Sequence, residues 1–212
     1  MHMNCKTIFY TQRVYDVLEY KERRDAIDQR LPSFLDKCGF LPVGLPNDIE
    51  IAKKIVSNVN HNGVLLSGGN TLGEYGGDAP ERDAMEHWLL DYSIQHEIPV
   101  FGICRGMQLI MSHFGVNLHN VENHVGKCHA VNGLIARDCV NSFHNMAAFE
   151  MDNITEHFDI ISVAGDGVVE AIKHKVYSIA AIMWHPEREK EYCEDDCALI
   201  KKVYNTRGGQ LL

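Results

Sequence analysis

Short apolar segments alternate with longer amphipathic segments through the first half of the chain. Four apolar segments have the length of buried strands, at residues 7–11, 40–43, 63–66 and 100–103. Between and after them, four amphipathic segments have the length and spacing of helices, at residues 20–38, 48–58, 81–97 and 105–114. Strands that alternate with helices are typical of the α/β class, in which helices cover both faces of a parallel sheet.

The second half of the chain has a different pattern. Five short β-prone runs with turn residues between them predict further strands, some paired as hairpins, at residues 131–136, 140–143, 160–164, 168–172 and 178–183. A last amphipathic run predicts a helix over residues 195–206, stopped by Gly208 and Gly209. We therefore expect one α/β domain over residues 1–212. Its doubly wound, mostly parallel sheet has flanking helices and a small antiparallel addition.

Composition and charge limit the classes of function that this chain can have. Of 212 residues, 45% are hydrophobic and 23% are charged, which is the balance of a globular protein. No apolar run reaches the ~20 residues that span a membrane. The formal net charge of −9 argues against nucleic acid and anionic membranes as partners. A site with a few local cations can still take an anionic substrate.

The cysteines do not form a disulfide framework, because their number is odd and their spacing is irregular. We expect free thiols in a reducing, cytoplasmic location. The seven are Cys5, Cys38, Cys104, Cys128, Cys139, Cys193 and Cys197.

One of these cysteines has the setting of a nucleophile. Cys104 stands between a predicted buried strand and a helix that begins at once, with Gly102 and Gly106 on either side. Small flanking residues are what a sharp strand-to-helix turn needs, as in the nucleophile elbow of hydrolases. The free N–H groups at the start of the helix favour a thiolate and can also bind an oxyanion. The alternative is a buried structural cysteine.

A base and its orienting group are predicted in Trp184-His185-Pro186-Glu187. An apolar strand brings His185 to its carboxyl end, where open α/β sheets build their sites. Residues two apart on an extended chain point to the same side, so Glu187 can hold the His185 ring. The alternative is a histidine at a strand end beside a solvated glutamate.

Further candidates follow from this chemistry. Gly68 and Gly69 come directly after a buried strand, and a Gly-Gly backbone can approach a ligand closely and donate an N–H group to an oxyanion. Gln108 lies one helical turn after Cys104 and can face the same pocket. Four residues at the end of a β-prone run can bind the charged head of an amino acid: Asn141, Ser142, Phe143 and His144. Plain turns and solvated strand ends are the alternatives.

Together these motifs resemble the class I glutamine amidotransferase-like superfamily, of flavodoxin-like fold, and within it the γ-glutamyl hydrolases of peptidase family C26. The resemblance covers most of the chain. Its motifs are Gly68-Gly69, Arg82-Asp83, Gly102-Ile-Cys104-Arg-Gly-Met-Gln108, Leu118-His-Asn-Val121 with His124, Val140-Asn-Ser-Phe-His144 and Trp184-His-Pro-Glu187. The Cys-Arg-Gly-x-Gln pattern is characteristic of the hydrolase branch.

The resemblance implies a hydrolase that cuts a γ-glutamyl amide and releases glutamate through a thioester on Cys104. His185 and Glu187 would complete a triad, and the backbones of Gly69 and Arg105 would form the oxyanion hole. The substrate would be held by Gly68, Gln108, Asn141, Ser142, Phe143 and His144. No cofactor, metal or nucleic acid is implied, and the oligomeric state is open, with a homodimer as one option.

The resemblance does not fix the leaving group. The loop over residues 70–80 is short, and Asn145-Met146 replaces a more polar pair found in many relatives. One relative type releases a nucleotide phosphoramidate from its γ-glutamyl conjugate in capsule modification, and this gives the specific substrate expected here. Cations for a phosphate would come from Arg13, Arg23, Arg24 or Lys127.

Other functions compete with this one. A glutaminase subunit that delivers ammonia to a synthetase partner would use the same residues. Another alternative is a family member that has lost catalysis and only binds its ligand. The presence of Cys104, His185 and Glu187 together argues against it. A non-enzymatic metal-binding protein would use Cys193 and Cys197 or Cys128 and His129, but no second pair has zinc-finger spacing.

Overall fold

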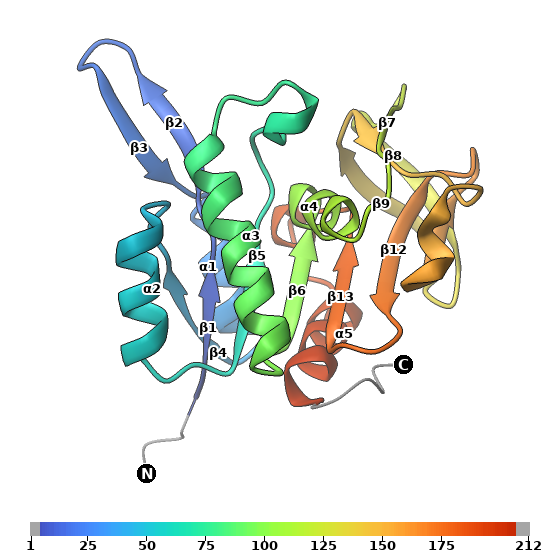
Figure 1. The fold of residues 1–212 in the computed structure, drawn as a ribbon. Coiled ribbons are helices and arrows are strands. Elements are labelled where there is room, and N and C mark those ends of the chain that lie inside the picture. The colour runs from blue at the N-terminus through green and yellow to red at the C-terminus, as the bar shows by residue number, and fades with distance from the viewer. Residues whose placement is uncertain (1–4, 207–212) are drawn as a thin grey trace.

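The computed structural model describes residues 5–206, which are built around one nine-stranded sheet. The strand order is β4-β1-β5-β6-β13-β12-β11-β8-β9 (Figure 1). In chain order these strands are β1 (Lys6–Tyr10), β4 (Phe40–Gly44), β5 (Gly63–Leu66), β6 (Val100–Ile103), β8 (Val125–Gly133), β9 (Arg137–Phe143), β11 (Phe158–Ala164), β12 (Val169–His174) and β13 (Ile179–Ile182).

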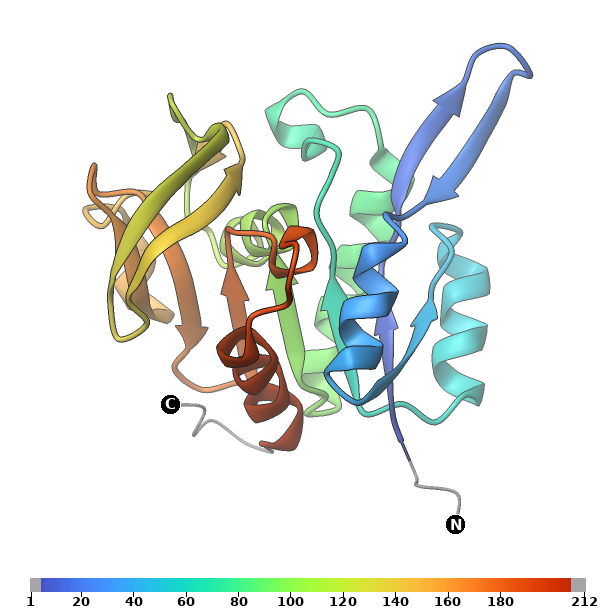
Figure 2. The ribbon, with the colours of Figure 1, turned by 180° about the vertical axis from the view of Figure 1, so that it is seen from behind.

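Five neighbouring strands, from β4 to β13, are parallel, so their carboxyl ends lie at one edge of the sheet. Helices α1 and α5 pack on one face, and α2, α3 and α4 pack on the other (Figures 1 and 2). Their bounds are α1 (Arg30–Lys37), α2 (Ile49–Asn58), α3 (Pro80–Gln95), α4 (Arg105–His113) and α5 (Glu194–Asn205). The predicted doubly wound α/β fold is confirmed.

The remaining four strands extend the same sheet in antiparallel fashion. This is the predicted antiparallel addition. β8 begins at Val125, several residues before the predicted start at 131, because its first half is exposed and polar and gives no apolar signal. Two short strands, β7 (His119–Asn120) and β10 (Met146–Ala147), pair separately beside it.

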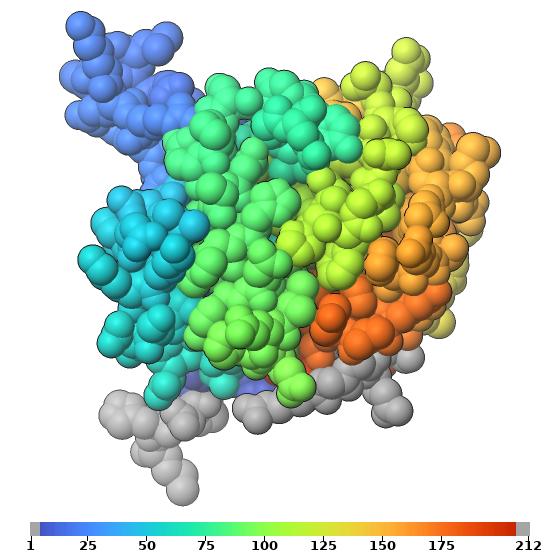
Figure 3. Space-filling view, in the orientation of Figure 1, coloured from blue at the N-terminus to red at the C-terminus, as the bar shows by residue number. Residues whose placement is uncertain are grey.

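The predicted helix over residues 20–38 is wrong in its first part. That region is a hairpin of β2 (Arg13–Val17) and β3 (Glu22–Ala26), which projects from the body of the molecule (Figure 3). Arg23 holds it by ion pairs to Asp16 (3.0 Å) and to Glu81 on α3. Because charge pairs rather than buried apolar residues fix this hairpin, alternating hydrophobicity does not reveal it.

The cysteines also depart from expectation. Cys128 on β8 and Cys139 on β9 form a disulfide across the edge pair of strands, with their Cα atoms 5.5 Å apart. The prediction that all cysteines are free is therefore wrong for this pair, which the sequence separates by 11 positions and the hairpin brings together. The other five cysteines are free.

The remaining helices begin and end close to their predicted limits, and α5 ends at Asn205. The predicted stop at Gly208 and Gly209 lies outside the described residues. Within residues 5–206, no helix combines the length and the apolar character that a membrane crossing requires.

Candidate active site

Cys104 sits in a tight, strained turn between β6 and α4. Its φ is 51°, a value that a non-glycine residue adopts at a cost of about 1–3 kcal/mol. There is no space for side chains on either side. A Cβ at Gly106 would lie 2.1 Å from the backbone oxygen of Leu66, and a Cβ at Gly102 would lie 2.8 Å from the backbone of Gly106. The turn thus has the elbow geometry that the two glycines predict.

His185 follows β13, the strand beside β6, so both residues come from neighbouring strand ends. Its Nδ1 lies 2.7 Å from Oε1 of Glu187, and its ring interacts electrostatically with Cys104. Because Nδ1 faces the carboxylate, Nε2 is the ring nitrogen that is left for Cys104. Burial by itself lowers the pKa of His185, but hydrogen bonds and charges of Cys104 and Glu187 outweigh it and raise the pKa to about 9.

Asn141 on β9 holds the backbone of His185. Its Oδ1 accepts a hydrogen bond from the His185 N–H at 2.9 Å, and its Nδ2 donates to the His185 carbonyl at 2.8 Å. Ser142 is also turned away from Cys104, because its hydroxyl donates to the carbonyl of His124 at 2.6 Å. Neither residue lines the cavity beside Cys104, and their predicted contact with a substrate stays a prediction.

Arg82, buried in the first turn of α3, fixes the loop after β5. Its guanidinium donates to the carbonyls of Ser67 (2.8 Å), Gly68 (3.3 Å) and Gly69 (2.6 Å). In a trans peptide the N–H points opposite to the preceding carbonyl, so the N–H of Gly69 is directed away from Arg82. A Cβ at Gly68 would lie 2.6 Å from Cε1 of His185, so the loop backbone passes directly against the imidazole.

The side chain of Arg105 points away from the sulfur, into α3. It forms buried ion pairs with Glu86 and Asp83, and Glu86 also pairs with Arg82 at 2.9 Å. This network joins the start of α4 to the loop at residues 67–70. The backbone N–H of Arg105 is in the first turn of α4, where no carbonyl of the same helix can accept its hydrogen bond.

A cavity of about 430 Å³ opens beside Cys104. Seven predicted site residues line it: Gly69, Cys104, Arg105, Gln108, Phe143, His144 and His185. Gln108 donates from Nε2 to the carbonyl of Met146 at 2.8 Å. The predicted Gly68 borders a smaller cavity of about 30 Å³ on the other side of His185. Six further residues line the cavity that were not predicted from the sequence to contact a substrate: Asn70, Thr71, Val125, Asn145, Met146 and Arg188.

Two arginines supply positive charge at the cavity. Arg13, at the base of the hairpin, lies over Gly69 and has no ion pair within residues 5–206. Arg188 stacks on the ring of Phe143 at 4.4 Å. Of the four cations considered from the sequence, only Arg13 reaches the cavity. Arg23 and Arg24 are engaged by acidic residues, and Lys127 lies elsewhere on β8.

Comparison with known proteins agrees with this geometry. A family model described as Peptidase C26 matches residues 10–187. The chain is 33% identical over 186 residues to the gamma-glutamyl-CDP-amidate hydrolase of Campylobacter jejuni, which covers 84% of this chain and 88% of that protein. The chain belongs to the peptidase C26 family. The resemblance inferred from the motifs is thereby confirmed, and membership supports a hydrolase of the glutamine amidotransferase-like type.

Solved structures support the fold of this C26 protein. The structure of PurLQS from Thermotoga maritima superposes with a TM-score of 0.65 at 15% identity and covers 95% of this chain and 98% of that one. A glutamine amidotransferase from the same organism gives a TM-score of 0.60 at 14% identity, covering 86% and 76%. At 14–15% sequence identity, this likeness establishes the class I glutamine amidotransferase fold and no more than the fold.

Proposed function

We propose that this C26 family member hydrolyses the amide bond of a γ-glutamyl conjugate, with Cys104 as the nucleophile. One observation carries the proposal: a strained cysteine at a helix start interacts with a histidine that a buried glutamate orients, and the cysteine and the histidine line a cavity. Nucleophile, base and orienting group in this order are the requirement for covalent acyl transfer.

In the first half of the reaction the Cys104 sulfur attacks the γ-carbonyl carbon and forms a C–S bond. The carbonyl oxygen becomes an oxyanion that the N–H groups of Gly69 and Arg105 can stabilise, each donor contributing a factor of about 10²–10³ in rate. The imidazolium of His185 then gives its proton to the amide nitrogen as the C–N bond breaks. The amine or phosphoramidate leaves, and a γ-glutamyl thioester remains.

In the second half, His185 takes a proton from water, and the resulting hydroxide attacks the thioester carbon. The C–S bond breaks, glutamate is released, and the proton on His185 restores the starting pair with the thiolate. The raised pKa of His185, about 9, supports this cycle because the imidazolium is present at neutral pH as the acid for the first step.

The cavity provides polar groups for the two ends of such a substrate. Gln108 and the segment around His144 line it and suit the α-amino and α-carboxylate groups of glutamate. Arg13 and Arg188 also line it and suit an anionic leaving group. The Campylobacter jejuni relative is named for a CDP-amidate, so we take a nucleotide phosphoramidate as the leaving group, with capsule modification as its setting.

The test is a panel of γ-glutamyl compounds scored for glutamate release: glutamine, γ-glutamyl amines, γ-glutamyl peptides and γ-glutamyl phosphoramidates of nucleotides. We expect the phosphoramidates to have the highest kcat/KM, and Cys104→Ala to abolish turnover of every compound. Arg13→Gln should lower kcat/KM for the phosphoramidates by about 10-fold or more, since a charge-assisted hydrogen bond contributes about 1.5–3 kcal/mol. The same variant should leave glutamine turnover unchanged.

Two results would refute parts of the proposal. Turnover that survives Cys104→Ala would rule out the covalent mechanism. A preference for free glutamine over every conjugate would instead assign the chain to the glutaminase subunits that deliver ammonia to a synthetase.

A further inference from the structure

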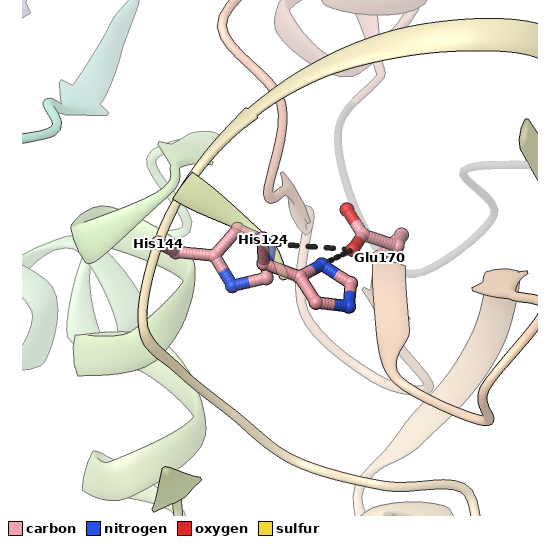
Figure 4. Close-up of side chains that lie close together, drawn as sticks. All are labelled: His124, His144 and Glu170. Atoms are coloured by element: carbon pink, nitrogen blue, oxygen red, sulfur yellow. Dashed lines mark hydrogen bonds and ion pairs between the residues drawn. The ribbon is translucent and has the colours of Figure 1, made fainter. Parts of the chain in front are cut away.

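Three histidines converge on one buried glutamate behind the wall of the cavity. Glu170 on β12 is fully buried, and its Oε1 lies 3.1 Å from Nε2 of His129 on β8. The same oxygen lies 3.3 Å from Nδ1 of His124, just before β8, and 3.3 Å from Nε2 of His144, just after β9. Figure 4 shows two of these histidines and the carboxylate facing one another. The proposed reaction uses none of these three contacts.

Hydrogen bonding leaves much of this cluster unsatisfied. Although Oε1 of Glu170 is close, Nδ1 of His124 and Nε2 of His129 have no hydrogen bond of acceptable geometry, and neither has Oε2 of Glu170. Buried polar atoms are normally paired, so several unpaired atoms around one point indicate a ligand between them. One contact in the cluster is a hydrogen bond, between Nε2 of His144 and Oε1 of Glu170 at 3.3 Å.

We infer that His124, His144 and Glu170 form a binding site for a divalent transition metal, of which zinc is the expected ion. Imidazole nitrogens and carboxylate oxygens are ordinary zinc ligands, with bond lengths of about 2.0–2.2 Å. In a tetrahedron with such bonds, neighbouring ligand atoms lie about 3.3 Å apart. The N···O separations of 3.3 Å from Glu170 to His124 and to His144 match this spacing, and water or a further group would complete the coordination.

The surroundings of the cluster are those of a metal site. Nε2 of His124 lies 2.9 Å from Oδ2 of Asp166, and a carboxylate on the far nitrogen of a metal-binding histidine orients the ring and raises its basicity.

The position of the cluster suggests what the metal does. Its ligands come from the residue just before β8, from the residue just after β9 and from β12, and His144 also lines the cavity. A metal here would tie the antiparallel edge strands to the centre of the sheet and fix the cavity wall around residues 144–146. It has no contact with Cys104 and takes no part in bond breaking.

This inference replaces the expectation that no metal is bound. That expectation rested on short spacings such as Cys193 to Cys197, whereas the three ligands are spread over residues 124–170. The strand order, which places β12, β11 and β8 side by side, brings them together.

The test measures metal binding by the full-length protein without using its activity. Protein stripped with a chelator is titrated with Zn²⁺ by calorimetry, and with Co²⁺ while the visible absorption of tetrahedral cobalt is recorded. We expect one ion per chain and the visible bands of nitrogen and oxygen ligation. Glu170→Gln and His124→Gln should remove both signals, and Asp166→Asn should weaken binding by about 10- to 100-fold.

The matched control is His87→Gln. His87 and His113 form another close histidine pair, with their Nδ1 atoms 3.2 Å apart, so a histidine there reports chance binding. This variant should bind the ion like the original protein. The inference is overturned if the unaltered, folded protein binds no ion stoichiometrically, which would leave water or a shared proton in the cluster. It is equally overturned if Glu170→Gln, with an unchanged circular dichroism spectrum, binds as well as His87→Gln.

Discussion

At the residue scale, the site depends on where backbone atoms are allowed to come close together. Cys104 keeps a positive φ because Gly102 and Gly106 leave room for β5 and α4 to close around the turn. Gly68 does the same for His185, whose Cε1 would be only 2.6 Å from an added Cβ. The positions of Cys104 and His185 therefore depend on the neighbouring glycines, which have no side chain to keep the backbones apart.

The His185–Glu187 contact predicts a specific change in pH dependence. The pKa of His185 is raised to about 9, so the imidazolium is present below that pH and is lost as pH rises through it. Activity that needs this acid should fall on a basic limb near pH 9. Glu187→Gln removes one of the interactions that raise the pKa, so the limb should move to lower pH, and kcat should fall by about 10-fold or more.

The measurement is a kcat/KM profile from pH 6 to 10 for the original enzyme and for Glu187→Gln. Glu191→Gln, an exposed change nearby in the sequence, serves as the control and should keep the original profile. A basic limb at the same pH in both Glu187→Gln and the original enzyme would show that Glu187 does not act on the imidazole.

Local motifs made part of the site predictable. Cys104, His185 and Glu187 each stand beside residues that set their geometry, so a short segment is enough to identify them. The role of Asn141 was not predictable, because it depends on β9 meeting the His185 turn across 44 positions. The same holds for the stacking of Arg188 on Phe143, two lining residues that are 45 positions apart in the sequence.

At the element scale, α3 organises the loop after β5 through Arg82. The guanidinium of Arg82 donates hydrogen bonds to three carbonyls and to Glu86. A lysine ammonium lacks the planar set of donors that these four bonds require. We expect Arg82→Lys to keep the charge beside Glu86 but to loosen the Gly69 loop. Because this loop supplies one proposed oxyanion donor, kcat should fall by about 10²-fold while KM changes little.

Steady-state kinetics on the preferred substrate, with thermal unfolding alongside, check this expectation. Arg24→Lys, an exposed change of the same type on the hairpin, should leave both kcat and unfolding unaltered. An Arg82→Lys enzyme that keeps full kcat would mean that the loop is held without the guanidinium fork.

Elements were predictable where burial sets the pattern. The strands β5, β6 and β13 are buried at every position and appear as continuous apolar runs. The hairpin β2–β3 was missed because it has one fully buried side chain, Val14, and its charges resemble those of an exposed helix. The first part of β8 was missed for the same reason.

At the scale of the whole molecule, the sheet divides its tasks between two halves. The parallel half ends in the Cys104 and His185 turns, as expected for an α/β sheet that builds its site at the carboxyl edge. The antiparallel half supplies Phe143 and His144 as the opposite wall of the cavity. This half ends in the exposed edge pair β8–β9. An interaction that stabilises this pair of strands therefore also fixes the wall of the cavity.

The Cys128–Cys139 disulfide is one such fastening, and it predicts that stability depends on redox state. Closing a loop between residues 11 positions apart restricts the unfolded chain and stabilises the fold by about 2–3 kcal/mol. Urea unfolding with and without reductant should therefore differ by this amount for the original protein, and Cys128→Ser should match the reduced curve under both conditions. Cys5→Ser, which alters a free exposed thiol, should retain the full difference. Coincident curves for the original protein would mean that the two sulfurs face each other as thiols, and the β8–β9 edge would then rest on its backbone ladder and on the His–Glu cluster.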